Sequence, residues 1–163
     1  MKLIFLDIDG VLNNIDSKSR CGIFKGIDDD KVQRLKQIVD ATDARIVLTS
    51  TWKTHWDKNK DLIEDMGNYL NRKFKKQGLR VMDKTTDDGV HRGAGIINYI
   101  NNFHTEVESW IVIDDEYFCD YKELDIISHM IKTVFFDCYN TNGSGGLQDL
   151  HVKLAIELLN KEE

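Results

Sequence analysis

The 163-residue sequence contains no proline and no closely spaced pair of cysteines. Glycine and asparagine must therefore make its turns. Cys21, Cys119 and Cys138 are odd in number and far apart, which favours reduced thiols in the cytoplasm over a disulfide framework. No apolar run is long enough to cross a bilayer, and the start of the chain lacks the pattern of a signal peptide. We therefore expect a cytoplasmic protein that does not contact membranes.

The composition is that of a globular protein, with 41% hydrophobic and 31% charged residues. The length suits one domain with a full core, and no interdomain linker or internal repeat is visible, so we expect a single domain over residues 1–163. The net charge of −6 argues against a dedicated nucleic-acid coat but leaves room for a local basic patch.

The first dozen residues carry the most informative pattern. Leu3 to Leu6 form an apolar run typical of a strand buried in a parallel sheet, and Asp7, Asp9 and Gly10 follow at once. Two acids at the end of a buried strand are costly unless a cation compensates them, and a divalent metal such as Mg²⁺ prefers such oxygen ligands. Taken alone, the motif could also be an ordinary Asp-Gly turn with solvated acids.

Strand-like and helix-like segments then alternate along the chain. We expect further strands at 44–48, 79–82, 110–113 and 133–136, and helices after the N-cap Asp28, over 57–77, after 91–93 and through 150–159, the last preceded by a glycine-rich connection at 142–146. This order predicts an α/β fold: a three-layer, Rossmann-like domain with a five-stranded parallel sheet. Only the loop 13–27 and the segment 53–78 could cover the strand ends, so we expect a minimal cap or none.

Polar residues recur where the expected strands end. Asp7 and Asp9 follow the first strand, Thr49 and Ser50 the second, and Asp114 and Asp115 the fourth, while Arg92 opens a helix. The carboxyl ends of parallel strands share one edge, so these side chains can converge. Carboxylates for a metal, hydroxyl donors and a strong cation are what phosphoryl transfer requires.

These residues carry a resemblance to a known family. Phe-Leu-Asp7-Ile-Asp9-Gly-Val-Leu, Ile-Val-Leu-Thr49-Ser, Arg92 and Ile-Val-Ile-Asp114-Asp115-Glu resemble, in order, the motifs of haloacid dehalogenase (HAD)-like phosphatases. More narrowly, Leu-Thr-Ser-Thr-Trp-Lys, Asp-Lys-Thr, Arg-Gly-x-x-Ile and the late Gly-Leu pair resemble the HAD domain of Swiss Army Knife RNA-repair-type proteins.

The resemblance implies a Mg²⁺-dependent phosphomonoesterase acting through an aspartyl-phosphate. Asp7 would be the nucleophile and Asp9 the general acid and base. Mg²⁺ would be held by the Asp7 carboxylate, the Asp9 carbonyl and Asp115, with Asp114 beside them.

Thr49 would hydrogen-bond the phosphoryl oxygens. Ser50, Gly10 and Lys53 are further candidates for substrate contact. Arg92 would take the place where a lysine is commoner in the family, and Lys84 is the competing candidate for that role.

Alternatives remain for the substrate. A phosphorylated small molecule and a nucleic-acid end both fit, the latter favoured by the RNA-repair resemblance and by the basic segment at 72–76. That segment is also what a solvated helix C-terminus would contain. Trp52 could stack on a base, although packing in the core is commoner for such a residue.

A different class of function is also open. A receiver-type signalling domain would be phosphorylated at the end of the third strand, where Asp83 is followed by Lys84. A non-catalytic binding domain of the same fold would have lost Asp7 or Asp9, and both are present.

Overall fold

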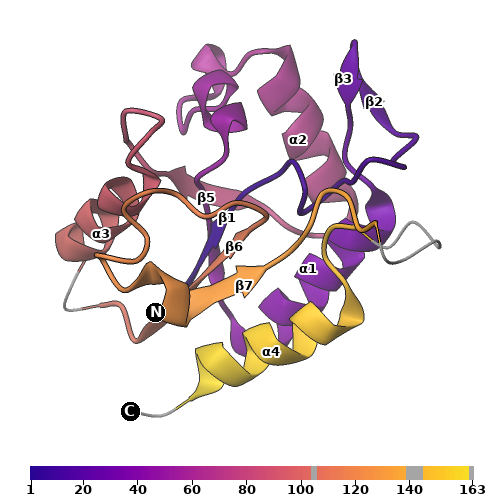
Figure 1. Ribbon diagram of the computed structural model, residues 1–163. Helices are drawn as coiled ribbons and strands as arrows, with labels where there is room; N and C mark the ends of the chain where they lie inside the picture. Colours follow the sequence, from indigo (N-terminus) through magenta and orange to yellow (C-terminus); the bar gives the residue numbers. More distant parts are fainter. Residues whose placement is uncertain (104–105, 139–144, 162–163) are drawn as a thin grey trace.

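The computed structural model describes residues 1–103, 106–138 and 145–161. Within these residues, a parallel sheet of five strands has the order β5-β4-β1-β6-β7 (Figure 1). Its strands are β1 (Lys2–Leu6), β4 (Arg45–Leu48), β5 (Val81–Lys84), β6 (Ser109–Asp114) and β7 (Met130–Lys132).

Helices cover both faces of this sheet. The side chains of α1 (Asp29–Thr42), α2 (Asp65–Lys76) and α4 (Asp149–Asn160) join one buried cluster, and those of α3 (Arg92–Asn102) join the other. Alternate residues of β1 supply both clusters, Ile4 and Leu6 to the first and Leu3 and Phe5 to the second. The expected three-layer α/β fold is confirmed.

β1 lies at the centre of the sheet, where its apolar residues Leu3 to Leu6 are fully buried between the helices on the two faces. Leu6 pairs with Leu48 of β4 on one side and with Ile113 of β6 on the other. The chain thus runs from β1 to one side of the sheet and later returns to the other. The carboxyl end of β1 is therefore the point where such sheets bind their ligands.

Short segments stand over this edge. They are the two-stranded hairpin of β2 (Arg20–Cys21) and β3 (Phe24–Lys25), and the 3₁₀ turns η1 (Thr51–His55) and η2 (Lys60–Leu62). A further 3₁₀ turn, η3 (Ile126–His129), precedes β7. In the described ranges the loop after β1 thus adds only the hairpin, in agreement with the expected minimal cap.

Two expected elements are placed differently. The fifth strand lies at Met130–Lys132 rather than 133–136, because Lys132 is the residue that pairs with Asp114 at the end of β6. Val134 and Phe136, whose apolar side chains favoured a strand, are exposed. The helix expected over 57–77 begins only at Asp65, and Leu62, which falls inside the expected range, is 63% exposed in η2.

Other expectations hold in part. Asp28 is the N-cap of α1, although its carboxylate bonds to Ser17 and Lys31 rather than to the helix backbone. Most of the expected glycine-rich connection lies outside the described residues. No helix in the described part of the chain is long and apolar enough to cross a membrane.

Candidate active site

Hydrogen bonds of the sheet continue past the strand ends and fix the first residues of the site. The Asp7 N–H donates to the Ile113 carbonyl (2.9 Å), and the Thr49 N–H donates to the Leu6 carbonyl (2.9 Å). Both backbones are therefore held at the centre of the carboxyl edge. The predicted convergence of residues from β1, β4 and β6 is what the structure shows.

Three carboxylates gather at this edge. Asp7, Asp114 and Asp115 each place one carboxylate oxygen within 4.8 Å of the others. Burial, reinforced by the Asp114 charge and opposed by Arg92, raises the pKa of Asp7 to about 8. Burial and the charges of Asp114 and Glu116 raise the pKa of Asp115 to about 6. Burial and mutual repulsion thus both disfavour the charged form of these two carboxyl groups.

Arg92 is the cation that contacts this group. Its Nη1 donates to Asp7 Oδ1 (3.1 Å) and to Asp114 Oδ2 (2.7 Å), and all three side chains are almost fully buried. The centroid of the Phe118 ring lies 4.1 Å from the guanidinium carbon of Arg92. The Tyr121 hydroxyl donates a hydrogen bond to Asp114 Oδ2 (3.2 Å). These contacts leave the Arg92 charge fixed between two of the acids.

The start of α3 places Arg92. The Asp120 carboxylate accepts hydrogen bonds from the Gly93 N–H (3.2 Å) and the Ala94 N–H (2.8 Å), which satisfies two free donors of the first turn. A Cβ on Gly93 would lie 2.9 Å from the Asp120 carboxylate, so glycine permits this close approach.

Lys84, the competing basic residue, points elsewhere. Its Nζ donates to the Lys53 carbonyl (3.2 Å) and forms an ion pair with Asp57 (3.2 Å). Neither of these contacts involves Asp7 or Asp114, the two acids that Arg92 binds.

The acidic group fits a hard divalent cation such as Mg²⁺. Carboxylate oxygens are its preferred ligands, and the three carboxylates lie close enough together to share one ion. Gly10 makes room for the arrangement, since its φ is +76° and a Cβ would lie 2.1 Å from Asp115 Oδ2. The Gly10 carbonyl accepts a hydrogen bond from Thr133 Oγ1 (2.7 Å), which ties the turn to the end of the sheet.

Asp9 lies outside this acidic group and is more exposed. Its Oδ1 accepts a hydrogen bond from Asn13 Nδ2 (2.8 Å), and its Oδ2 accepts one from Trp52 Nε1 (3.0 Å). Trp52 itself is buried, so its indole packs in the core as expected while its N–H holds the carboxylate. Both oxygens of Asp9 therefore have a fixed donor.

The hydroxyls after β4 behave differently from each other. Thr49 Oγ1 is buried and has no hydrogen-bond partner among the described residues. Ser50 caps η1 by accepting from the Trp52 N–H, and it also bonds to Asp7. Lys53 is held by two contacts. Its Nζ pairs with the buried Asp87 carboxylate and donates to the Thr49 carbonyl (3.3 Å).

Two other candidates are not brought to the site. Asp83 is the residue that would be phosphorylated in a receiver-type domain. Its carboxylate accepts a hydrogen bond from the Tyr99 hydroxyl (2.9 Å) and pairs with Lys58 (2.6 Å). In the basic segment 72–76, Lys73 and Lys76 pair with Asp29 of α1. That pairing supports the solvated-helix interpretation of the segment.

Sequence reasoning missed several residues that build the site. They are Asn13, Phe118, Asp120, Tyr121, Lys132 and Thr133; Lys132 Nζ donates to the Asp115 carbonyl (2.5 Å). None belongs to the short motifs, although Asn13, Phe118, Asp120 and Tyr121 each lie within six residues of a paired acid.

A parallel sheet with this acidic group at its carboxyl edge is the arrangement expected of a HAD-type domain. Within that class, residues 3–149 match the family described as the HAD domain in Swiss Army Knife RNA repair proteins. The chain belongs to this family, and in general terms it is a HAD-type phosphohydrolase. No curated protein and no solved structure gives a significant match to the chain.

Proposed function

We propose that the protein is a Mg²⁺-dependent phosphomonoesterase that works through an aspartyl-phosphate on Asp7. The observation that carries this proposal is the buried Thr49 hydroxyl without a partner, one strand away from Asp7. A buried donor without a partner is costly, and a phosphoryl oxygen of a bound substrate would satisfy it.

The metal would be held by Asp7 and Asp115 with Asp114 beside them, where it would neutralise charge on the phosphoryl oxygens. Arg92 fixes the Asp7 and Asp114 carboxylates through its two hydrogen bonds, which keeps one Asp7 oxygen oriented and the other available. An Asp7 oxygen attacks phosphorus, and the bond from phosphorus to the ester oxygen breaks.

Asp9 gives its proton to the leaving oxygen as that bond breaks. It then takes a proton from a water molecule, whose oxygen attacks the phosphorus of the aspartyl-phosphate, releasing inorganic phosphate and restoring Asp7. The Trp52 and Asn13 hydrogen bonds hold Asp9 in one orientation for both steps.

Nucleotides or nucleic-acid ends are the proposed substrates. The family description supports this choice, and so does the small amount of chain over the sheet edge, which would admit a strand terminus. Lys73 and Lys76 are paired with Asp29 and have no part in the proposed substrate binding.

Release of inorganic phosphate, with and without Mg²⁺, tests the proposal. The panel contains p-nitrophenyl phosphate, mononucleotides and oligonucleotides phosphorylated at either end. Asp7→Asn keeps the shape of the side chain but removes the nucleophile, so we expect it to abolish Mg²⁺-dependent turnover. Asp83→Asn is the matched control and should retain it. Turnover that survives in Asp7→Asn, or that is lost only in Asp83→Asn, would refute the proposed mechanism.

A further inference from the structure

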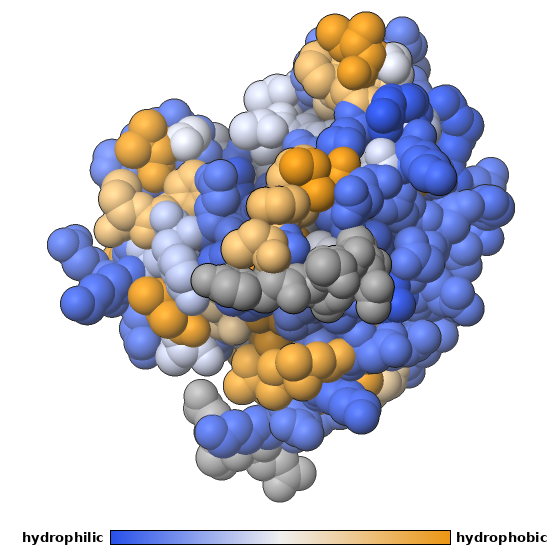
Figure 2. Space-filling view, turned by 45° about the vertical axis from the view of Figure 1, so that its right-hand side comes forward, coloured by the Kyte–Doolittle hydropathy of each residue, from blue (hydrophilic) through white to orange (hydrophobic). Residues whose placement is uncertain are grey.

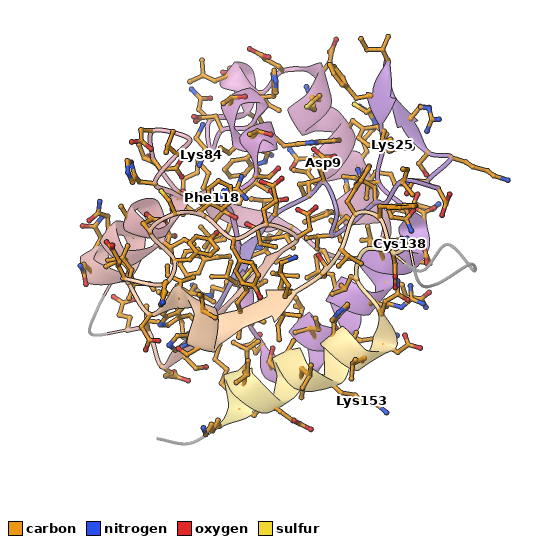
Figure 3. The ribbon with its side chains drawn as sticks, in the orientation of Figure 1. Asp9, Lys25, Lys84, Phe118, Cys138 and Lys153 are labelled. Carbon is orange, nitrogen blue, oxygen red and sulfur yellow. The ribbon has the colours of Figure 1, made fainter. Side chains whose placement is uncertain are left out.

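A cavity of about 500 Å³ opens beside Asp9. Its lining comes from five parts of the chain: the turn after β1, the hairpin, η1, α2 and the segment after β7. The residues that line it with Asp9 are Phe24, Lys25, Thr51, Trp52, Thr54, His55, Met66 and Phe135. Figure 3 shows Asp9 and Lys25 on the same side of the sheet edge, where the hairpin stands.

The cavity has a defined relation to the reaction. Asp9 lines it, whereas Asp7 and Arg92 do not. In the proposed function, Asp9 protonates the oxygen that leaves with the rest of the substrate. The group that carries that oxygen would therefore occupy this cavity.

The lining indicates what kind of group fits. Phe24 is 57% exposed on β3, and Phe135, Met66 and the Trp52 indole supply further apolar surface. Figure 2 shows apolar side chains gathered at the tip of the hairpin, and Ile23 and Phe24 are the exposed ones there. An exposed phenylalanine next to a cavity can stack on a flat ring of the ligand. Such stacking does not depend on a particular set of hydrogen bonds.

Polar groups complete the lining. The Thr51 and Thr54 side chains can exchange hydrogen bonds with ring edges or sugar hydroxyls. Lys25 Nζ donates to the Ile15 carbonyl (2.6 Å), which holds a positive charge at the hairpin base. A largely apolar pocket of this size with a few fixed polar groups is typical of a small-molecule subsite.

We propose that this cavity is the leaving-group site for a nucleoside, whose base packs against Phe24 and Phe135 while its phosphorylated oxygen reaches Asp9. This inference rests on the proposed function, since the phosphate must lie at Asp7 for the ring to reach the cavity. Its chemistry is shared by a free nucleotide and by the terminal nucleotide of a strand.

Hydrogen bonds hold the backbone at Phe135 and just after the hairpin that carries Phe24. The Ile15 N–H donates to the Phe135 carbonyl (3.0 Å), and the Tyr69 hydroxyl accepts from the Ile27 N–H (3.0 Å) after β3. Asn13 Nδ2 donates both to Asp9 and to the Gly26 carbonyl (3.0 Å). The cavity walls and the proposed acid thus share one set of hydrogen bonds, which lowers the cost of ordering the site on binding.

The test compares neighbouring residues that differ in whether they line the cavity. Phe24→Ala and Phe135→Ala remove lining rings, while Ile23→Ala and Phe136→Ala remove exposed apolar side chains next to them. The kcat/KM is measured for a mononucleotide, an oligonucleotide with the same terminal phosphate, a phosphoserine peptide and glycerol phosphate.

We expect the lining variants to lose roughly 5- to 100-fold in kcat/KM on the nucleotide substrates, the range that base–aromatic stacking usually supports. Glycerol phosphate turnover and both control variants should change little. A loss on one nucleotide substrate alone supports the site and identifies whether a free nucleotide or a strand end fills it. An equal loss on glycerol phosphate or on the peptide would overturn the proposal.

A binding measurement separates this proposal from the proposed function. Calorimetric titration of Asp7→Asn with adenosine 5′-phosphate, and of its double variants with Phe24→Ala and Ile23→Ala, reports the cavity without turnover. Weaker binding in the Phe24 variant alone supports the cavity even if no phosphate release is ever found. Equal binding in all three proteins refutes it even if the phosphatase activity is established.

Discussion

Trp52→Phe should impair the acid step and spare the rest of the protein. The substitution keeps a buried aromatic ring and deletes the Nε1–H that donates to Asp9 Oδ2 at 3.0 Å. A hydrogen bond to a charged group contributes about 1.5–3 kcal/mol. Asn13 still holds the other carboxylate oxygen, so we expect the lower end of that range, a loss of roughly 10-fold in kcat/KM.

The leaving group decides whether the loss comes from acid catalysis. An alkyl phosphate needs a proton on its leaving oxygen, whereas p-nitrophenolate leaves readily without one. The kcat/KM reports the steps up to departure of the leaving group and leaves out the hydrolysis of the aspartyl-phosphate, which both substrates share. The kcat/KM of Trp52→Phe should therefore fall on glycerol phosphate and change little on p-nitrophenyl phosphate, both measured by phosphate release at saturating Mg²⁺.

The chain supplies a matched control four residues later. Trp56 is also buried, and its Nε1 donates to Asn71 Oδ1 at the same distance of 3.0 Å. Trp56→Phe thus deletes the same atom and the same kind of bond without touching Asp9. The reasoning is refuted if Trp56→Phe loses as much activity on glycerol phosphate as Trp52→Phe, or if Trp52→Phe loses equally on both substrates.

Three further predictions follow from the same site. Thr49→Val removes a buried hydroxyl that has no partner among the described residues and that costs about 1–3 kcal/mol. The melting temperature should therefore rise by about 2–4 °C per kcal/mol while turnover falls, and a lower melting temperature would contradict this. Gly10→Ala places a Cβ 2.1 Å from Asp115 Oδ2 and should weaken Mg²⁺ binding in a titration, whereas Gly78→Ala, with nearly the same φ (+75° against +76°) and open space around it, should leave Mg²⁺ affinity intact. Because the pKa of Asp7 rises from 3.8 to about 8 on folding, the metal-free folded protein favours the protonated carboxyl and should lose stability as the pH rises towards 8. Mg²⁺ should restore that stability, because it binds the ionised form. Melting curves that show higher metal-free stability at about pH 8 than at about pH 6 would contradict the assignment.

The strand ends could be predicted from the sequence because their signals are local. The apolar run at Leu3 to Leu6 and the β-branched run before Thr49 each ended where the structure ends a strand. Parallel pairing then brought Asp7, Thr49 and Asp114 to one edge, as topology alone requires.

Segments whose apolar residues do not face the core misled the same reasoning. Val134 and Phe136 have strand-like side chains but are 40% and 59% exposed, and the sheet ends before them. Leu62 fitted a helical face by spacing, yet it lies in a 3₁₀ turn before α2 begins. Periodicity reports only which residues could share a face, and tertiary contacts decide which do.

Contacts between distant side chains were beyond the sequence. The packing of Phe118 on Arg92 and the capping of α3 by Asp120 depend on how the segment after β6 folds back, which no local pattern encodes. Trp52 was expected to be core and is core, but its N–H bond to Asp9 required the coordinates.

Asn13 has a consequence for any attempt to exchange parts of this protein. One amide joins Asp9, the Gly10 N–H (2.9 Å) and the Gly26 carbonyl beyond the hairpin. The hairpin is therefore not a modular insert, because a transplanted loop without a carbonyl at the position of Gly26 removes one of the three hydrogen bonds that orient the amide. Substrate range and acid chemistry would then change together, and a chimera should carry residues 9–27 as one indivisible block.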